Sequence, residues 1–68
     1  MSIRLVVNGE DRQVSPSLSV ADLLVELDLQ IARVAVEHNR RVLKRHEFPR
    51  VILADGDRLE IVHFVGGG

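Results

Sequence analysis

The most strand-like run in the second half of the chain leads directly into three glycines: Asp57-Arg58-Leu59-Glu60-Ile61-Val62-His63-Phe64-Val65-Gly66-Gly67-Gly68. No charged or bulky residue follows it, so the tail presents the main-chain carboxylate of Gly68 as its reactive group. Glycines at a terminus are equally typical of a frayed end or of a cloning remnant. The run therefore predicts a β-strand that holds and aims a functional carboxylate, with those two origins as the alternative.

The first fourteen residues have the pattern of a β-hairpin. Apolar residues alternate over residues 3–7, which predicts a strand with one buried face. Asn8 and Gly9 both tolerate positive φ angles and favour a type I′ turn. Residues 10–14 are then expected to return as a polar edge strand, which Ser15-Pro16-Ser17 ends.

Residues 20–27 have the pattern of a short amphipathic helix. Ser19 is the expected N-cap, with Asp22 in the second position of a capping box. Apolar residues at i, i+3, i+4 and i+7 place one stripe on a single helix face, and the stripe consists of Val20, Leu23, Leu24 and Leu27. We expect the helix to end near Asp28 and the stripe to belong to the core.

The middle of the chain predicts two more strands. Residues 34–36 form a short apolar run, which we interpret as a strand buried on both faces. Residues 39–41 are expected to turn into a brief strand at 42–43.

The remaining segments are turns and the last strand. Residues 44–50 are polar and irregular around Phe48-Pro49, and residues 51–53 fit either a brief strand or a packed turn. Asp55-Gly56-Asp57 predicts a turn before a final strand over 58–65. The order of elements predicts an α+β fold, a small mixed sheet with one main helix packed on one face.

Size and composition restrict the function. The 68 residues allow one domain, residues 1–68, without a large cavity for a substrate. A net charge of −1, two Phe and no Trp or Tyr argue against nucleic-acid and membrane binding. Absence of Cys excludes disulfides and thiolate chemistry and agrees with a cytoplasmic location. These features favour a carrier, modifier or adaptor over an enzyme.

Four segments resemble the ThiS family, the small sulfur carriers of thiamine biosynthesis with the ubiquitin-like β-grasp fold. They are Val6-Val7-Asn8-Gly9-Glu10, Ser19-Val20-Ala21-Asp22-Leu23-Leu24, Val34-Ala35-Val36-Glu37-His38-Asn39 and Leu53 through Gly68. The last segment also resembles the related MoaD-type subunits of molybdopterin synthase, whereas the first two and the short length favour ThiS. Relatives often have Gly in place of Asp28 and Pro in place of Lys44.

The resemblance implies the chemistry of the tail. A ThiF-like enzyme would adenylate the Gly68 carboxylate with ATP and Mg²⁺, and persulfide sulfur would then displace AMP and leave a thiocarboxylate. A ThiG-like thiazole synthase would take that sulfur for the thiazole ring. The chain itself would be a co-substrate, not an enzyme, and would bind no cofactor. The alternatives are a MoaD-like subunit and a ubiquitin-like binding or conjugation module.

The site residues follow from the shape of the tail. Gly67 and Gly68 lack a Cβ, so they fit a narrow channel and leave the carbonyl open to attack, and Gly66 adds reach. If the strand buries Leu59 and Ile61, its other face exposes Val62 and Phe64 as a docking patch beside the tail. The alternative is a bulge or twist that buries Phe64.

Other polar clusters predict less. His38, His46 and His63 have no metal-ligand spacing, so we expect no metal site. The basic cluster Arg40, Arg41, Lys44 and Arg45 fits a solvated face or a surface that steers an acidic partner. Asp55 and Asp57 flank a turn glycine, where turn geometry explains them.

Overall fold

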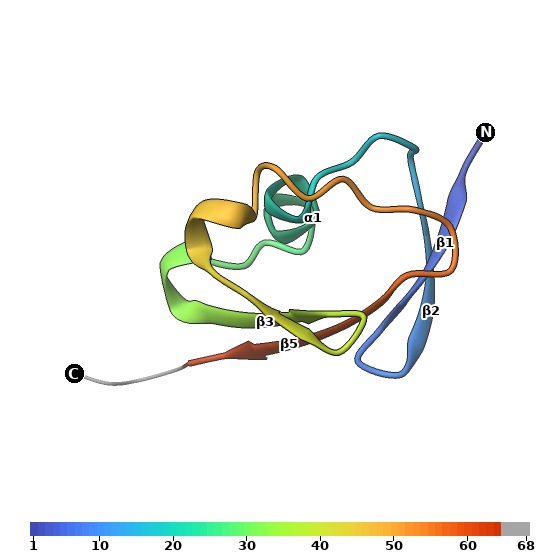
Figure 1. Ribbon diagram of the computed structural model, residues 1–68. Helices are drawn as coiled ribbons and strands as arrows, with labels where there is room; N and C mark the ends of the chain where they lie inside the picture. Colours follow the sequence, from blue (N-terminus) through green and yellow to red (C-terminus); the bar gives the residue numbers. More distant parts are fainter. Residues whose placement is uncertain (65–68) are drawn as a thin grey trace.

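The computed structural model describes residues 1–64, which form a five-stranded mixed sheet with one α-helix across one face (Figure 1). The strands are β1 (Ile3–Val7), β2 (Glu10–Val14), β3 (Val34–His38), β4 (Arg41–Leu43) and β5 (Arg58–His63), and the helix is α1 (Val20–Glu26). Two 3₁₀ turns, Ile31–Arg33 and Arg45–Glu47, were not predicted. The sheet order is β2-β1-β5-β3-β4, with β1 parallel to β5 and the other pairs antiparallel. The predicted α+β fold is confirmed.

Both hairpins turn on residues with positive φ. Asn8 and Gly9 join β1 to β2 with φ angles of 51° and 82°, as a type I′ turn requires. Asn39 and Arg40 join β3 to β4 with φ angles of 50° and 71°. The two predicted turns are therefore confirmed, and β2 lies at the sheet edge as expected.

Helix α1 is capped at both ends. The Asp22 N–H donates to Ser19 Oγ and the Ser19 N–H donates to Asp22 Oδ2, each at 3.0 Å, which completes the predicted capping box. At the other end the Leu29 N–H donates to the Leu24 carbonyl at 2.9 Å. Asp28 has a φ of 59°, so the helix ends in a Schellman motif with an aspartate in the left-handed position that glycine usually fills.

The core lies between α1 and the inner face of the sheet. Its buried side chains are Leu5, Val7, Val20, Leu23, Leu24, Val34, Val36, Leu43, Phe48, Leu53, Leu59 and Ile61. Full burial of a Leu or Phe side chain contributes about 1.5–3 kcal/mol. Phe48 is 2% exposed, so it anchors the irregular segment 44–50 in the core.

Two features of the strands differ from the prediction, the burial of β3 and the end of β5. Residues 34–36 are not buried on both faces, because Ala35 is exposed between buried Val34 and Val36. The helix covers only one face of the sheet, so the prediction that this strand is buried on both faces was wrong, although β3 does lie between β5 and β4. β5 ends at His63 rather than at residue 65, and Val65 lies outside the described part of the chain.

Residues 51–53 are a packed connection with a single bridge, not a strand. Ile52 bridges to Ser19, and the Leu53 N–H donates to the Leu18 carbonyl at 2.8 Å. The segment thereby fixes the entry to α1 against the loop that leads into β5.

Candidate functional site

The strand that leads to the glycine tail is the middle strand of the sheet. β5 pairs with β1 on one side and with β3 on the other (Figure 1). Gly66, Gly67 and Gly68, the predicted site residues of the tail, lie outside residues 1–64. The structure thus describes the strand that precedes the tail, up to Phe64.

A polar network fixes the start of β5. The Asp57 carboxylate accepts hydrogen bonds from His38 Nε2 at 2.8 Å, from the Ala54 N–H at 2.9 Å and from Asn39 Nδ2 at 3.1 Å. The Arg58 N–H donates to Asn39 Oδ1 at 2.8 Å. Partial burial raises the pKa of the Asp57 carboxyl, but these hydrogen bonds, with that of His38 first, together hold it below its usual value.

The end of β5 is held from two sides. The Phe64 N–H donates to the Arg33 carbonyl at 2.7 Å, which continues the pairing with β3. On the other side, Asn8 Nδ2 donates to the Ile61 carbonyl at 3.0 Å and the Ile61 N–H donates to Asn8 Oδ1 at 2.7 Å. The backbone is therefore held by hydrogen bonds up to Phe64, the last described residue.

Four apolar side chains form a patch on the outer face of the sheet. Val62 and Phe64 are 56% and 58% exposed, so the predicted exposure is confirmed and the alternative that buries Phe64 is wrong. Ala35 lies directly across from Val62 in the pairing of β3 with β5, and exposed Val42 lines the same shallow depression. We call Ala35, Val42, Val62 and Phe64 the outer-face patch.

Acidic side chains border the outer-face patch. Glu37 and Glu60 are cross-strand partners and line the same depression as Val62. Arg40 and Arg58 lie beside them in a second depression. An apolar centre with a charged rim is the usual composition of a protein-binding surface.

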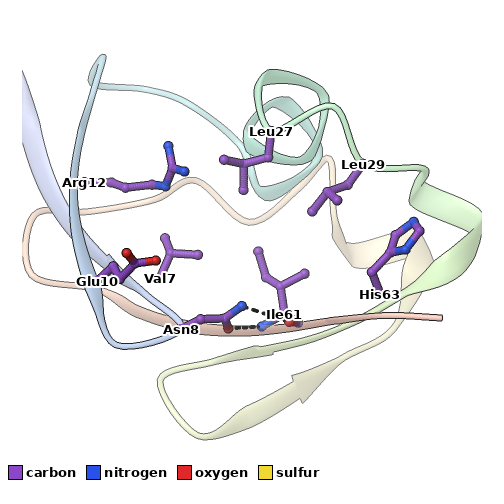
Figure 2. Close-up of a pocket in the computed structure, with 8 residues that line it drawn as sticks. All are labelled: Val7, Asn8, Glu10, Arg12, Leu27, Leu29, Ile61 and His63. Atoms are coloured by element: carbon purple, nitrogen blue, oxygen red, sulfur yellow. Dashed lines mark hydrogen bonds between the residues drawn. The ribbon is translucent and has the colours of Figure 1, made fainter. Parts of the chain in front are cut away.

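The opposite side of β5 borders an open hollow between α1 and the β1–β2 hairpin (Figure 2). Its lining combines apolar and charged side chains, namely Val7, Asn8, Glu10, Arg12, Leu27, Leu29, Ile61 and His63. The hollow has a volume of about 270 Å³, less than the roughly 300–1,000 Å³ of most ligand pockets.

The remaining polar candidates make local contacts. His38 contacts Asp57, and His63 lines the hollow. Within residues 1–64, no group of three or more His, Cys, Asp or Glu side chains could hold a metal ion. The Asp57 N–H donates to the Ala54 carbonyl at 3.1 Å, as the predicted turn requires, whereas the Asp55 carboxylate accepts from the Arg4 N–H of β1 at 2.8 Å, a contact that turn geometry did not predict.

The basic cluster is partly used within the fold. Arg41 pairs with Glu47 at 2.9 Å, and Arg45 donates to the Ala32 carbonyl at 3.2 Å. These contacts favour a solvated face over a steering surface.

In the described part of the chain, no helix is long and apolar enough to cross a membrane.

Sequence reasoning missed two features of this site. It identified Asn8 only as a turn residue and His38 only as a histidine without metal-ligand spacing. Their contacts with Ile61 and Asp57 join residues 53 and 19 positions apart, and no local pattern signals such a pairing.

The five-stranded sheet, the single helix and a central last strand that leads to a glycine tail define a small ubiquitin-like β-grasp protein. A sequence model of the ThiS family matches residues 5–68. The chain therefore belongs to the ThiS family.

Individual relatives agree with this assignment. The chain is 38% identical to the sulfur carrier protein ThiS of Bacillus subtilis over 65 residues, which cover 94% of this chain and 98% of that protein. It superimposes on the crystal structure of the thiamine biosynthesis protein ThiS from Geobacter metallireducens with a TM-score of 0.83 and 40% identity, covering 97% of this chain and 100% of the other.

A larger relative also matches. The chain is 46% identical over 66 residues to a thiazole synthase of Paramagnetospirillum magneticum, which covers 97% of this chain but only 20% of that protein. A thiazole synthase of Magnetococcus marinus is 35% identical over 66 residues, which again cover 97% of this chain and 20% of that protein. The chain thus spans about a fifth of these two relatives.

Proposed function

We propose that this protein is a sulfur carrier of thiamine biosynthesis, in which the Gly68 carboxylate is adenylated and then converted into a thiocarboxylate. The observation that carries this proposal is the family match, which extends through Gly68 and therefore includes the whole tail. A relative of almost the same length is named a sulfur carrier protein. The match to ThiS favours thiamine over the molybdopterin alternative.

The proposed chemistry begins with a carboxylate that is a poor electrophile. A free α-carboxyl group has a pKa of about 3.3–3.7, so the Gly68 terminus is ionised at neutral pH. A ThiF-like enzyme activates it with Mg²⁺ and ATP, and pyrophosphate leaves as the acyl adenylate forms. The terminal sulfur of a persulfide then displaces AMP to give an acyl disulfide. A thiol reductant cleaves this disulfide and releases the thiocarboxylate.

The glycine tail alone gives a partner little to bind. Ordering each backbone residue costs about 1–2 kcal/mol, and Gly66, Gly67 and Gly68 have no side chains to offset that cost. The outer-face patch lies directly before the tail and exposes Val62 and Phe64. We therefore assign docking of the adenylating enzyme to this patch and reaction with it to the tail.

The second partner would be a ThiG-like thiazole synthase, which takes the sulfur from the thiocarboxylate. Two thiazole synthases contain a region similar to this chain. A carrier region within such proteins supports a functional link between the two activities. In this scheme the carrier supplies no catalytic side chain and acts as a co-substrate in the cytoplasm.

The test is the intact mass of the protein after incubation with a ThiF-like enzyme, ATP, Mg²⁺, a persulfide donor and a thiol. We expect a fraction heavier by one sulfur-for-oxygen exchange, located at Gly68 by fragmentation. A variant with one alanine appended after Gly68 is the control and should remain unmodified. Unchanged mass of the unextended protein would refute the proposal and favour a ubiquitin-like binding module.

A further inference from the structure

β5 loses its neighbour on one side before it reaches the tail. β1 pairs with β5 only at Val6↔Arg58 and Val7↔Leu59. On the other side, β3 pairs with β5 as far as Val34↔His63. From residue 60 onward, β5 is therefore an edge strand on its β1 side, and one ladder alone would hold it.

The side chain of Asn8 continues the missing ladder (Figure 2). The last main-chain bond from this side is the Asn8 N–H to the Leu59 carbonyl at 2.9 Å. The Asn8 carboxamide then donates to the Ile61 carbonyl at 3.0 Å and accepts from the Ile61 N–H at 2.7 Å. A carboxamide has the same donor and acceptor as a peptide group, so it adds one rung where β1 has turned away.

Position 8 combines two requirements. Its φ of 51° is in the left-handed region, which glycine, asparagine and aspartate tolerate best. Glycine would provide neither bond to Ile61, and an ionised aspartate would accept from the N–H but could not donate to the carbonyl. Asparagine alone among these three satisfies the turn and both backbone groups of Ile61.

We infer that Asn8 is a positioning residue, which orders the end of β5 up to Phe64 for productive binding by the adenylating partner. This inference rests on the proposed function. Ile61 is the last residue of β5 that is held from the β1 side, three positions before Phe64. Without the Asn8 rung, β3 alone restrains the end of β5, and the partner must order it on binding. The change affects productive binding, not the reactivity of the bound carboxylate.

Asn39 provides a matched control. It also occupies the first position of a hairpin turn, with a φ of 50°. Its side chain also makes two bonds near β5, accepting from the Arg58 N–H at 2.8 Å and donating to Asp57 Oδ1 at 3.1 Å. These bonds lie at the start of β5, away from the tail. Asn8→Gly and Asn39→Gly therefore each remove side-chain hydrogen bonds next to a hairpin turn, the first in the second half of β5 and the second at its start.

The first measurement is the steady-state release of pyrophosphate by a ThiF-like enzyme as the carrier concentration is varied. Loss of the Asn8 rung is expected to raise KM for the carrier about fivefold, the effect of one net hydrogen bond, with kcat unchanged. Asn8→Asp should raise KM in the same direction, and Asn39→Gly should change it less than about twofold. Equal KM increases in Asn8→Gly and Asn39→Gly would overturn the inference.

The second measurement needs no partner. In Asn8→Gly we expect faster amide exchange at Ile61 and a lower ¹⁵N order parameter at Phe64, and neither change in Asn39→Gly. An unchanged order parameter at Phe64 would overturn the positioning role. If the wild-type protein is not adenylated, the proposed function fails, and these two NMR measurements still decide whether Asn8 orders the end of β5 up to Phe64.

Discussion

Replacing Phe64 with alanine tests whether the outer-face patch binds the activating enzyme. A phenylalanine side chain presents on the order of 200 Å², so the exposed 58% leaves about 115 Å² available for burial. At about 25 cal/mol/Å², complete coverage would contribute about 3 kcal/mol, or about a hundredfold in affinity. Partial coverage and side-chain ordering reduce this value. We expect Phe64→Ala to lower kcat/KM for the carrier about tenfold.

The assay measures pyrophosphate release at sub-saturating carrier. Val25→Ala is the matched control, because Val25 is 68% exposed on helix α1 and does not belong to the patch. Both substitutions should change the free energy of unfolding by no more than about 0.5 kcal/mol, as is usual for surface positions. Equal kcat/KM for Phe64→Ala and the wild type would refute the docking role. A large loss of stability in Phe64→Ala would instead show that this side chain supports the fold.

Three further predictions concern stability, each measured by urea unfolding. The lowered pKa of Asp57 means that its contribution is complete above its unfolded pKa of about 3.9 and is lost as pH falls through the lower folded value. Asp57→Asn should flatten this acid dependence. Ser19→Ala removes the N-cap acceptor of helix α1 and should cost about 1 kcal/mol. Asp28→Gly relieves a left-handed residue with a φ of 59° and should stabilise the protein by up to about 1 kcal/mol.

Each of these predictions has a clear contrary result. An acid transition in Asp57→Asn identical to that of the wild type would mean that other carboxyl groups dominate it. A neutral Ser19→Ala would mean that water replaces the cap without cost. Destabilisation by Asp28→Gly would show that the loss of unfolded-state restraint outweighs the relief of strain.

Local chemistry explains what the sequence predicted correctly. Asn8-Gly9 and Asp55-Gly56 predict turns, because the backbone conformations that these residues prefer act within a few residues. The spacing of Ser19 and Asp22 predicts the start of the helix for the same reason. The alternation of the last strand correctly separated buried Leu59 from exposed Phe64, because a strand has only two faces.

Long-range pairing explains what could not be predicted. A short apolar run such as residues 34–36 does not reveal whether one or both faces are covered, and the exposed Ala35 is compatible with either. The rung between Asn8 and Ile61 depends on the register of β1 against β5. That register is a property of the assembled sheet. The exposure of Val62 and Phe64 in the outer-face patch was therefore predictable, whereas the hydrogen bonds between Asn8 and Ile61 were not.

The sheet order also makes the whole fold depend on its last strand. β1 with β2, and β3 with β4, form two hairpins that are not neighbours in the sheet, because β5 lies between them. An isolated hairpin is at best marginally stable in water. A chain truncated before residue 58 is therefore expected to remain unfolded, because nothing then pairs with both hairpins.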